Sequence, residues 1–180
     1  MRRSQRNYSL EEYFGAEVMS PYPCEYFDGE ITLIGGESIA HDTIAANVVG
    51  IVRGSHSQAF TGRMRVCTPS GLFTHPDASI VFGEPELTRD TLSNPVVLVE
   101  VLSGSTGDYD RGEKFELYRS IETLRDYVLI EQSGVEVEHR AKTADGWVSE
   151  TMDSLDQTVR LTGVDVEMPL KLIYERIEQS

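Results

Sequence analysis

Glu100 is the first residue whose surroundings need a chemical explanation. It stands inside residues 96–102, an otherwise apolar run that predicts a strand buried on both faces of a sheet. Burying an isolated carboxylate is costly, so Glu100 must be paired with a cation, bound to a metal, protonated, or placed where the strand opens into a cleft. An ion pair at the strand end is the structural alternative to a role in chemistry.

Asp77 supplies a second carboxylate at the head of another apolar run, residues 78–82. It follows Pro76, which is tolerated at a strand start, and it precedes Glu100 by 23 residues. That separation allows two adjacent strands joined by a loop over residues 83–94. Two converging carboxylates are suitable ligands for Mg²⁺. The alternative for Asp77 is turn formation.

Lys114 adds a cation, four residues after Asp110 on an expected helix. It either points back to the sheet or forms an exposed pair with Asp110. Two metal-holding acids and one ammonium group suit phosphodiester hydrolysis, because the metal and the lysine stabilise charge on the phosphate. Motifs of other enzyme classes are absent: the chain has no G-x-S-x-G, P-loop, H-E-x-x-H or G-x-G-x-x-G sequence.

The elements before these residues have clear sequence signals. Ser9-Leu10-Glu11-Glu12 has the form of a capping box and predicts a short amphipathic helix. Asp28-Gly29 between two strand-like runs predicts a hairpin. Apolar residues at helical spacing predict a long helix over 41–53, and strands are expected at 60–66, 72–74, 78–82 and 95–102.

The elements after Glu100 alternate between helix and strand patterns. Residues 110–113 are expected to cap a second helix, which carries Lys114, and in this interpretation Asp110 caps the helix and orients the lysine. Strands follow at 127–130 and 135–140, then a hairpin at Gly146 and a short helix over 170–177. With no repeat and no linker, the pattern predicts one mixed α/β or α+β domain over residues 1–180, with its core at about 10–177.

Composition excludes several classes of protein. A chain of 180 residues can bury a sufficient core without disulfides, and Cys24 and Cys67 are interpreted as ordinary thiols. No apolar run is long enough to cross a bilayer, and the basic start at residues 1–6 lacks the apolar stretch of a signal peptide, so a cytoplasmic location is expected. The 30 acidic against 16 basic residues give a net charge of -14, which opposes nucleic-acid binding unless a cation intervenes.

The chain also resembles the Uma-type restriction endonucleases of bacteria, within the PD-(D/E)XK nuclease superfamily. The similarity runs from about Leu10 to Ile177. The residues that carry it are Glu25, Asp28-Gly29-Glu30, His41, Pro76-Asp77, Glu100-Val101-Leu102-Ser103, Ser105-Thr106, the block from Tyr109 to Phe115, Tyr118-Arg119, and the block from Leu124 to Ile130.

This resemblance implies a restriction-endonuclease-like fold, with a central mixed sheet flanked by helices. It implies that Asp77 and Glu100 bind Mg²⁺, for which Mn²⁺ can substitute, with the Val101 carbonyl as a third oxygen and Lys114 as the catalytic lysine. The superfamily more often places that lysine two residues after the second acid, where this chain has Leu102. DNA is the substrate that the resemblance implies.

Glu30 and His41 match family positions as well. Both are expected to face the same cleft as catalytic residues, where His41 or Glu30 would help to move protons, and His41 would otherwise contact phosphate. Helix capping or a hydrogen-bonded histidine is the alternative for His41.

Two other functions remain open. One is a protein that keeps the nuclease fold without useful turnover and acts in binding or regulation, which the acidic net charge favours. The other is hydrolysis of a different phosphate substrate. A homodimer would suit cleavage of both strands of a duplex.

Overall fold

The computed structural model describes residues 7–35, 38–53, 55–104 and 106–177. The basic start at residues 1–6 and Ser105 therefore lie outside the described residues. The described part contains five helices: α1 (Leu10–Met19), α2 (Ile39–Val52), α3 (Gly107–Arg111), α4 (Glu113–Tyr118) and α5 (Leu170–Ile173). None of these helices is long and apolar enough to cross a bilayer.

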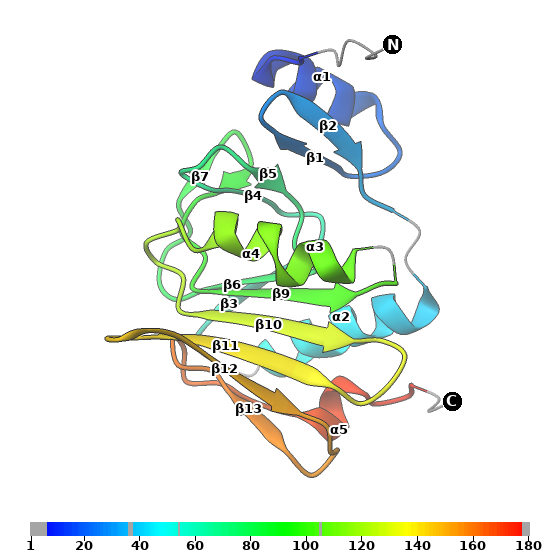
Figure 1. The fold of residues 1–180 in the computed structure, drawn as a ribbon, viewed down its shortest axis with the longest axis vertical. Helices are drawn as coiled ribbons and strands as arrows, with labels where there is room; N and C mark the ends of the chain where they lie inside the picture. The colour runs from blue at the N-terminus through cyan, green and yellow to red at the C-terminus, as the bar shows by residue number, and fades with distance from the viewer. Residues whose placement is uncertain (1–6, 36–37, 54, 105, 178–180) are drawn as a thin grey trace.

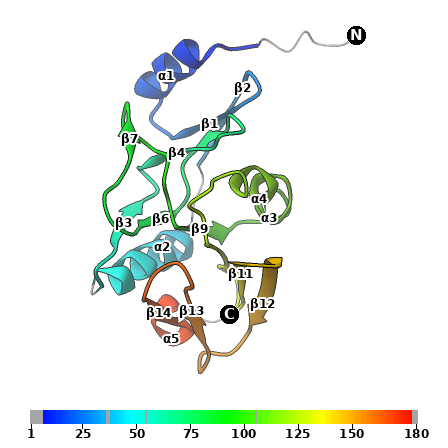
Figure 2. The same ribbon diagram turned by 90° about the vertical axis from the view of Figure 1, so that its left-hand side faces the viewer.

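A six-stranded mixed sheet forms the centre of the fold (Figure 1). Its strands, in spatial order, are β12 (Gly146–Met152), β11 (Val137–Thr143), β10 (Asp126–Glu131), β9 (Val97–Leu102), β6 (Ala78–Val81) and β3 (Gln58–Thr61). Strands β9 and β10 are parallel, and the other neighbours are antiparallel. Helix α2 lies on one face, and α3 with α4 on the other (Figure 2). The expected central mixed sheet flanked by helices is confirmed.

Strand β9 separates the two halves of the hydrophobic core. All six of its residues are buried, as the apolar run predicts. Side chains alternate between the two faces of a strand. Val97, Val99 and Val101 therefore pack in the core on the α2 face, and Leu98 and Leu102 pack in the core on the α4 face. Glu100 therefore projects toward the α4 face, between the two leucines.

A second six-stranded sheet lies beside α3 and α4. Its strands, in spatial order, are β2 (Glu30–Leu33), β1 (Cys24–Phe27), β5 (Phe73–Thr74), β4 (Arg65–Cys67), β8 (Thr91–Leu92) and β7 (Leu87–Thr88). The predicted hairpin is confirmed, because Asp28 and Gly29 take the positive φ values of 47° and 82° that suit a tight two-residue turn. A third, two-stranded sheet pairs β13 (Thr158–Arg160) with β14 (Glu167–Pro169).

Three boundary predictions need correction. The single strand expected over 60–66 is wrong: a turn in which the Met64 amide donates to the Thr61 carbonyl at 2.9 Å divides it into β3 and β4, which belong to different sheets. The loop expected over 83–94 contains the short strands β7 and β8. The helix expected over 170–177 ends at Ile173. At the other end of the chain, the predicted capping box at Ser9 is confirmed, and the helix that it starts continues to Met19.

The predicted capping role of Asp110 is also wrong. Asp110 lies inside α3, and Gly112 is the residue between α3 and α4. The break arises because Gly112 has φ -106° and ψ -98°, which is not a helical conformation. A Cβ atom at Gly112 would lie 3.0 Å from the Asp108 carbonyl, so this tight junction suits glycine.

Asp126 is a fully buried carboxylate that joins three parts of the fold. It accepts hydrogen bonds from His139 Nε2 at 2.8 Å, the Thr162 hydroxyl at 2.9 Å and the Gly163 amide at 2.7 Å.

Removing one partner of a buried charged network typically costs about 3–5 kcal/mol. We expect Asp126→Ala to lower the free energy of unfolding by about that amount in urea denaturation, whereas exposed Asp145→Ala should change it by less than about 0.5 kcal/mol. Equal effects of the two substitutions would show that the Asp126 hydrogen bonds do not stabilise the fold.

Candidate active site

Asp77 and Glu100 converge at one end of the central sheet. The β6–β9 ladder ends with the pair Ala78 and Val99, so the two acids are the next residues on their strands. The Val101 amide donates to Asp77 Oδ2 at 2.7 Å and fixes that carboxylate against β9. The predicted adjacency of the two acid-bearing strands is confirmed.

Glu100 is held by two groups from α4. Its Oε1 atom lies 2.9 Å from Lys114 Nζ and accepts the Tyr118 hydroxyl at 2.7 Å. Lys114 Nζ also donates to Asp110 Oδ1 at 3.2 Å. Only 6% of the Glu100 side chain and 7% of the Lys114 side chain are exposed. Lys114 thus points toward the sheet, which is the first of the two orientations left open by its spacing, and its pair with Asp110 is buried rather than exposed.

The burial of these groups sets their protonation. Burial raises the pKa of Glu100 to about 8; Lys114 opposes the shift, and the carboxylates of Asp110 and Asp77 add to it. Burial acts to lower the pKa of Lys114, but the carboxylates around it, led by Glu100 and Asp110, outweigh that effect and raise it. Lys114 is therefore an ammonium group over the whole neutral range.

Glu25 brings the second sheet to the same site. It lies on β1, and its two oxygens accept the Tyr109 hydroxyl from α3 at 2.6 Å and the Thr74 hydroxyl from β5 at 2.7 Å. Burial, together with the Glu25 carboxylate, raises the pKa of Tyr109, so its hydroxyl remains a donor. Glu25 therefore connects β1 and β5 to α3.

Apart from Thr74 and Tyr118, these side chains line one pocket with a volume of about 220 Å³. Its wall contains Asp77, Glu100, Val101 and Lys114. His41, from the first turn of α2, also lines it and places Nε2 3.3 Å from Asp77 Oδ2. The structure therefore brings together five of the six residues predicted for the site.

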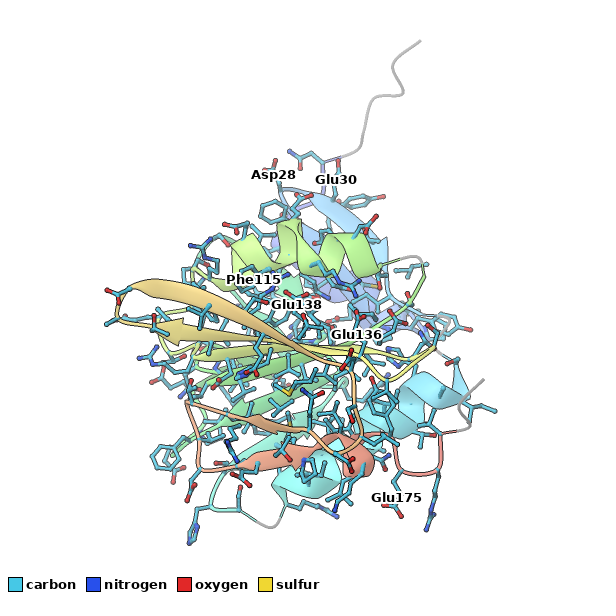
Figure 3. All side chains as sticks on the ribbon, turned by 60° about the horizontal axis from the view of Figure 1, so that its bottom comes forward. Asp28, Glu30, Phe115, Glu136, Glu138 and Glu175 are labelled. Atoms are coloured by element: carbon cyan, nitrogen blue, oxygen red, sulfur yellow. The ribbon has the colours of Figure 1, made fainter. Side chains whose placement is uncertain are left out.

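Glu30 is the exception. It is exposed at the start of β2, and Figure 3 shows it beside Asp28 at the outer tip of the hairpin. It lines a separate hollow, which shares Glu25 and Tyr109 with the pocket. The expectation that Glu30 and His41 face the same cleft is wrong, because the hairpin directs Glu30 beyond the Glu25–Tyr109 contact.

The oxygen atoms of Asp77 and Glu100 fit a hard divalent cation. Hydrogen bonds among the described residues use Asp77 Oδ2 and Glu100 Oε1, and they leave Asp77 Oδ1 and Glu100 Oε2 for another ligand. No group of three His, Cys, Asp or Glu side chains within the described ranges is arranged to hold a metal ion. A cation here would complete its coordination with backbone or water oxygens, as Mg²⁺ commonly does.

Sequence reasoning places none of Glu25, Tyr109, Tyr118 and His75 at the site, although the first three are among the residues that carry the family resemblance. Tyr118 follows Lys114 by four residues and so lies on the same helix face, a signal that the sequence does contain. Glu25 and His75 reach the pocket through the pairing of β1 with β5, a long-range contact of Tyr26 with Phe73. No local pattern reports that contact.

Comparison with known proteins gives one family match and two relatives in a cyanobacterium. The sequence model of the Uma2 family, described as "Putative restriction endonuclease", matches residues 10–171. The Synechocystis protein sll1609 is 31% identical over 142 residues, which cover 74% of this chain and 80% of that protein. The Synechocystis protein slr1290 is 30% identical over 174 residues, which cover 92% and 90%. Both relatives are described as uncharacterized.

A solved structure shares the fold. It is a crystal structure from Anabaena variabilis, described as "a putative nuclease belonging to DUF820". It superposes with a TM-score of 0.72, covering 94% of this chain and 99% of that one, at 17% sequence identity. At this identity the likeness concerns the fold.

Proposed function

Because this chain belongs to the Uma2 family, we propose that it is a metal-dependent endonuclease that hydrolyses phosphodiester bonds of DNA. The observation that carries the proposal is the convergence of Asp77, Glu100 and Lys114 in one pocket. Two carboxylates with free oxygens and one buried ammonium group match the needs of a reaction in which negative charge builds up on a phosphate.

Asp77 and Glu100 are the proposed ligands of Mg²⁺ or Mn²⁺, with the Val101 carbonyl as a third oxygen. When bound, the cation would activate water and neutralise phosphate charge. It would also add positive charge at the site itself, in a protein whose net charge of -14 otherwise repels a polyanion. The Val101 amide supports the site by holding the Asp77 carboxylate in place.

Lys114 and His41 have different proposed roles. The raised pKa of Lys114 keeps it protonated, so it stabilises charge and does not act as a base. His41 lies against Asp77. Histidine is the residue type best suited to transfer a proton near neutral pH, and we assign that role to His41. Tyr118 orients Glu100 through its hydrogen bond to Oε1.

The pH dependence of metal binding follows from Glu100. A carboxylate must lose its proton before it binds a cation, and the pKa of Glu100 is raised from 4.5 to about 8. We expect the affinity for Mg²⁺ to rise roughly tenfold per unit between about pH 6 and about pH 8, and then to level off. In the metal-free protein, the raised pKa makes the free energy of unfolding fall as the pH rises. The contribution of protonated Glu100 to stability is fully present below about pH 4.5 and is lost as the pH rises through 8. Calorimetric titration with Mg²⁺ checks the first effect, and an affinity independent of pH over this range would contradict it.

The second candidate is a nuclease-fold protein that binds without turnover, which the net charge of -14 favours. The third is hydrolysis of a different phosphate ester in the same pocket. One experiment distinguishes the three candidate functions. The wild-type protein is incubated with single-stranded DNA, double-stranded DNA and a small phosphodiester, each with Mg²⁺, with Mn²⁺ and with a chelator. The nuclease proposal expects metal-dependent cleavage of DNA. Cleavage of the small ester alone would support the third candidate, and cleavage of neither would support the second.

A further inference from the structure

A second cavity opens beside the candidate active site. It has a volume of about 390 Å³ and shares His41, His75 and Asp77 with the pocket that contains Glu100 and Lys114. This volume lies within the range of small-molecule sites in proteins. Because Asp77 belongs to both walls, an occupant of the second cavity would lie next to the phosphate bound in the first.

The lining of the second cavity suits a flat aromatic ring. Tyr22 lines it from the segment between α1 and β1, and the small side chains of Ala45 and Ala46 line it from α2. Tyr22 is 57% exposed, although its ring lies close to the backbone of Gly35, where a Cβ atom would be 3.2 Å from it. An aromatic ring that is supported by backbone and still exposed is available to stack with a second ring.

A positive charge lies at the same cavity. Arg63, in the turn between β3 and β4, is exposed and lines the wall, which also contains the exposed carboxylate of Asp42. An exposed guanidinium group can pair with a phosphate. The protein as a whole has 30 acidic and 16 basic residues, so neutralisation of phosphates alone is a weak basis for holding DNA. Base stacking supplies affinity without requiring further positive charge.

We propose that the second cavity binds an unstacked base of single-stranded DNA next to the cleaved phosphate, with Tyr22 stacking on the base and Arg63 contacting the backbone. The inference rests on the proposed nuclease function and adds the form of its substrate. A base within a duplex is stacked and paired, and it cannot enter a cavity unless it leaves the helix. A single strand presents such a base without that cost.

The test is equilibrium binding of a short fluorescent oligonucleotide, as a single strand and as a duplex, in the Glu100→Gln background so that DNA stays intact. The single strand should bind more tightly than the duplex. Tyr22→Ala should weaken binding of the single strand by about 5- to 150-fold, the usual effect of losing one base–aromatic stack. Ala46→Leu, which fills the cavity from a helix surface, should weaken it too. The matched control is Phe82→Ala. Phe82 is an aromatic residue that is 64% exposed and lies outside the second cavity, so its removal should have no effect.

Equal binding of the single strand by the parent, Tyr22→Ala and Ala46→Leu would overturn the inference, and so would tighter binding of the duplex by the parent. Cleavage by the wild-type protein distinguishes this failure from failure of the proposed function. If the cavity substitutions weaken binding of single-stranded DNA but the wild-type protein cleaves no DNA, the proposed nuclease activity is refuted and the proposed base-binding site is supported. The same two cavity substitutions are also made in the wild-type protein, and cleavage of the single strand that neither of them changes would refute the binding site but leave the proposed nuclease activity standing.

Discussion

Glu100→Gln should abolish the stabilisation of the protein by Mg²⁺. A ligand at 100 times its dissociation constant stabilises the folded state by about 2.7 kcal/mol. For a chain of this size that corresponds to a rise in melting temperature of about 5–10 °C. The glutamine keeps the shape of the side chain and can still accept the Tyr118 hydroxyl, but it removes the charge that binds the cation. We expect the variant to show a rise of less than about 1 °C.

The matched control for this prediction is Glu122→Gln. Glu122 is exposed and lies outside the pocket, so this variant should respond to Mg²⁺ as the wild type does. The assay is thermal melting with and without Mg²⁺ at about pH 8, where Glu100 is half ionised or more. If Glu100→Gln and Glu122→Gln show the same rise as the wild type, Glu100 is not a metal ligand.

Lys114→Met should have opposite effects on cleavage and on metal binding. It removes the ammonium group between Glu100 and Asp110 and leaves two buried carboxylates without a cation. We expect a loss of about 3–5 kcal/mol in the free energy of unfolding without metal. Cleavage should fall by about 10²- to 10³-fold, as when one charge-stabilising donor is removed from an active site. Mg²⁺ should bind more tightly than in the wild type, because the cation would no longer be repelled by an ammonium group in contact with its ligand Glu100.

Lys171→Met is the control, because Lys171 is exposed on α5. Urea denaturation, calorimetric titration and cleavage rates are measured on both variants. A Lys114→Met protein with wild-type cleavage and wild-type metal affinity would show that Lys114 serves only as the structural partner of Glu100.

The position of the two acids was predictable because it depends on local pattern. Residues 96–102 are too apolar for an exposed strand, so Glu100 had to be buried. Pro76 marks the start of the neighbouring strand, and the intervening segment is long enough to place Asp77 beside Glu100. Lys114 and Asp110 are four residues apart, which predicts their contact even though Gly112 interrupts the helix between them.

The rest of the site depends on contacts between distant segments. Glu25 reaches Tyr109 only because the β1–β2 hairpin pairs with β5, and the sequence has no local signal for that pairing. The location of Glu30 depends on the same pairing: the sequence Asp28-Gly29 predicts the turn, but it does not predict the direction in which the hairpin points. The division of residues 60–66 between two sheets is another long-range result.

The most direct test of the proposed metal-dependent nuclease is the rate of DNA cleavage by wild type and Glu100→Gln, purified identically and measured with Mg²⁺ and with a chelator. We expect cleavage by the wild type that requires the metal, and a rate for Glu100→Gln lower by about 10³-fold or more. Equal cleavage by both proteins, or cleavage that persists in the chelator, would contradict it.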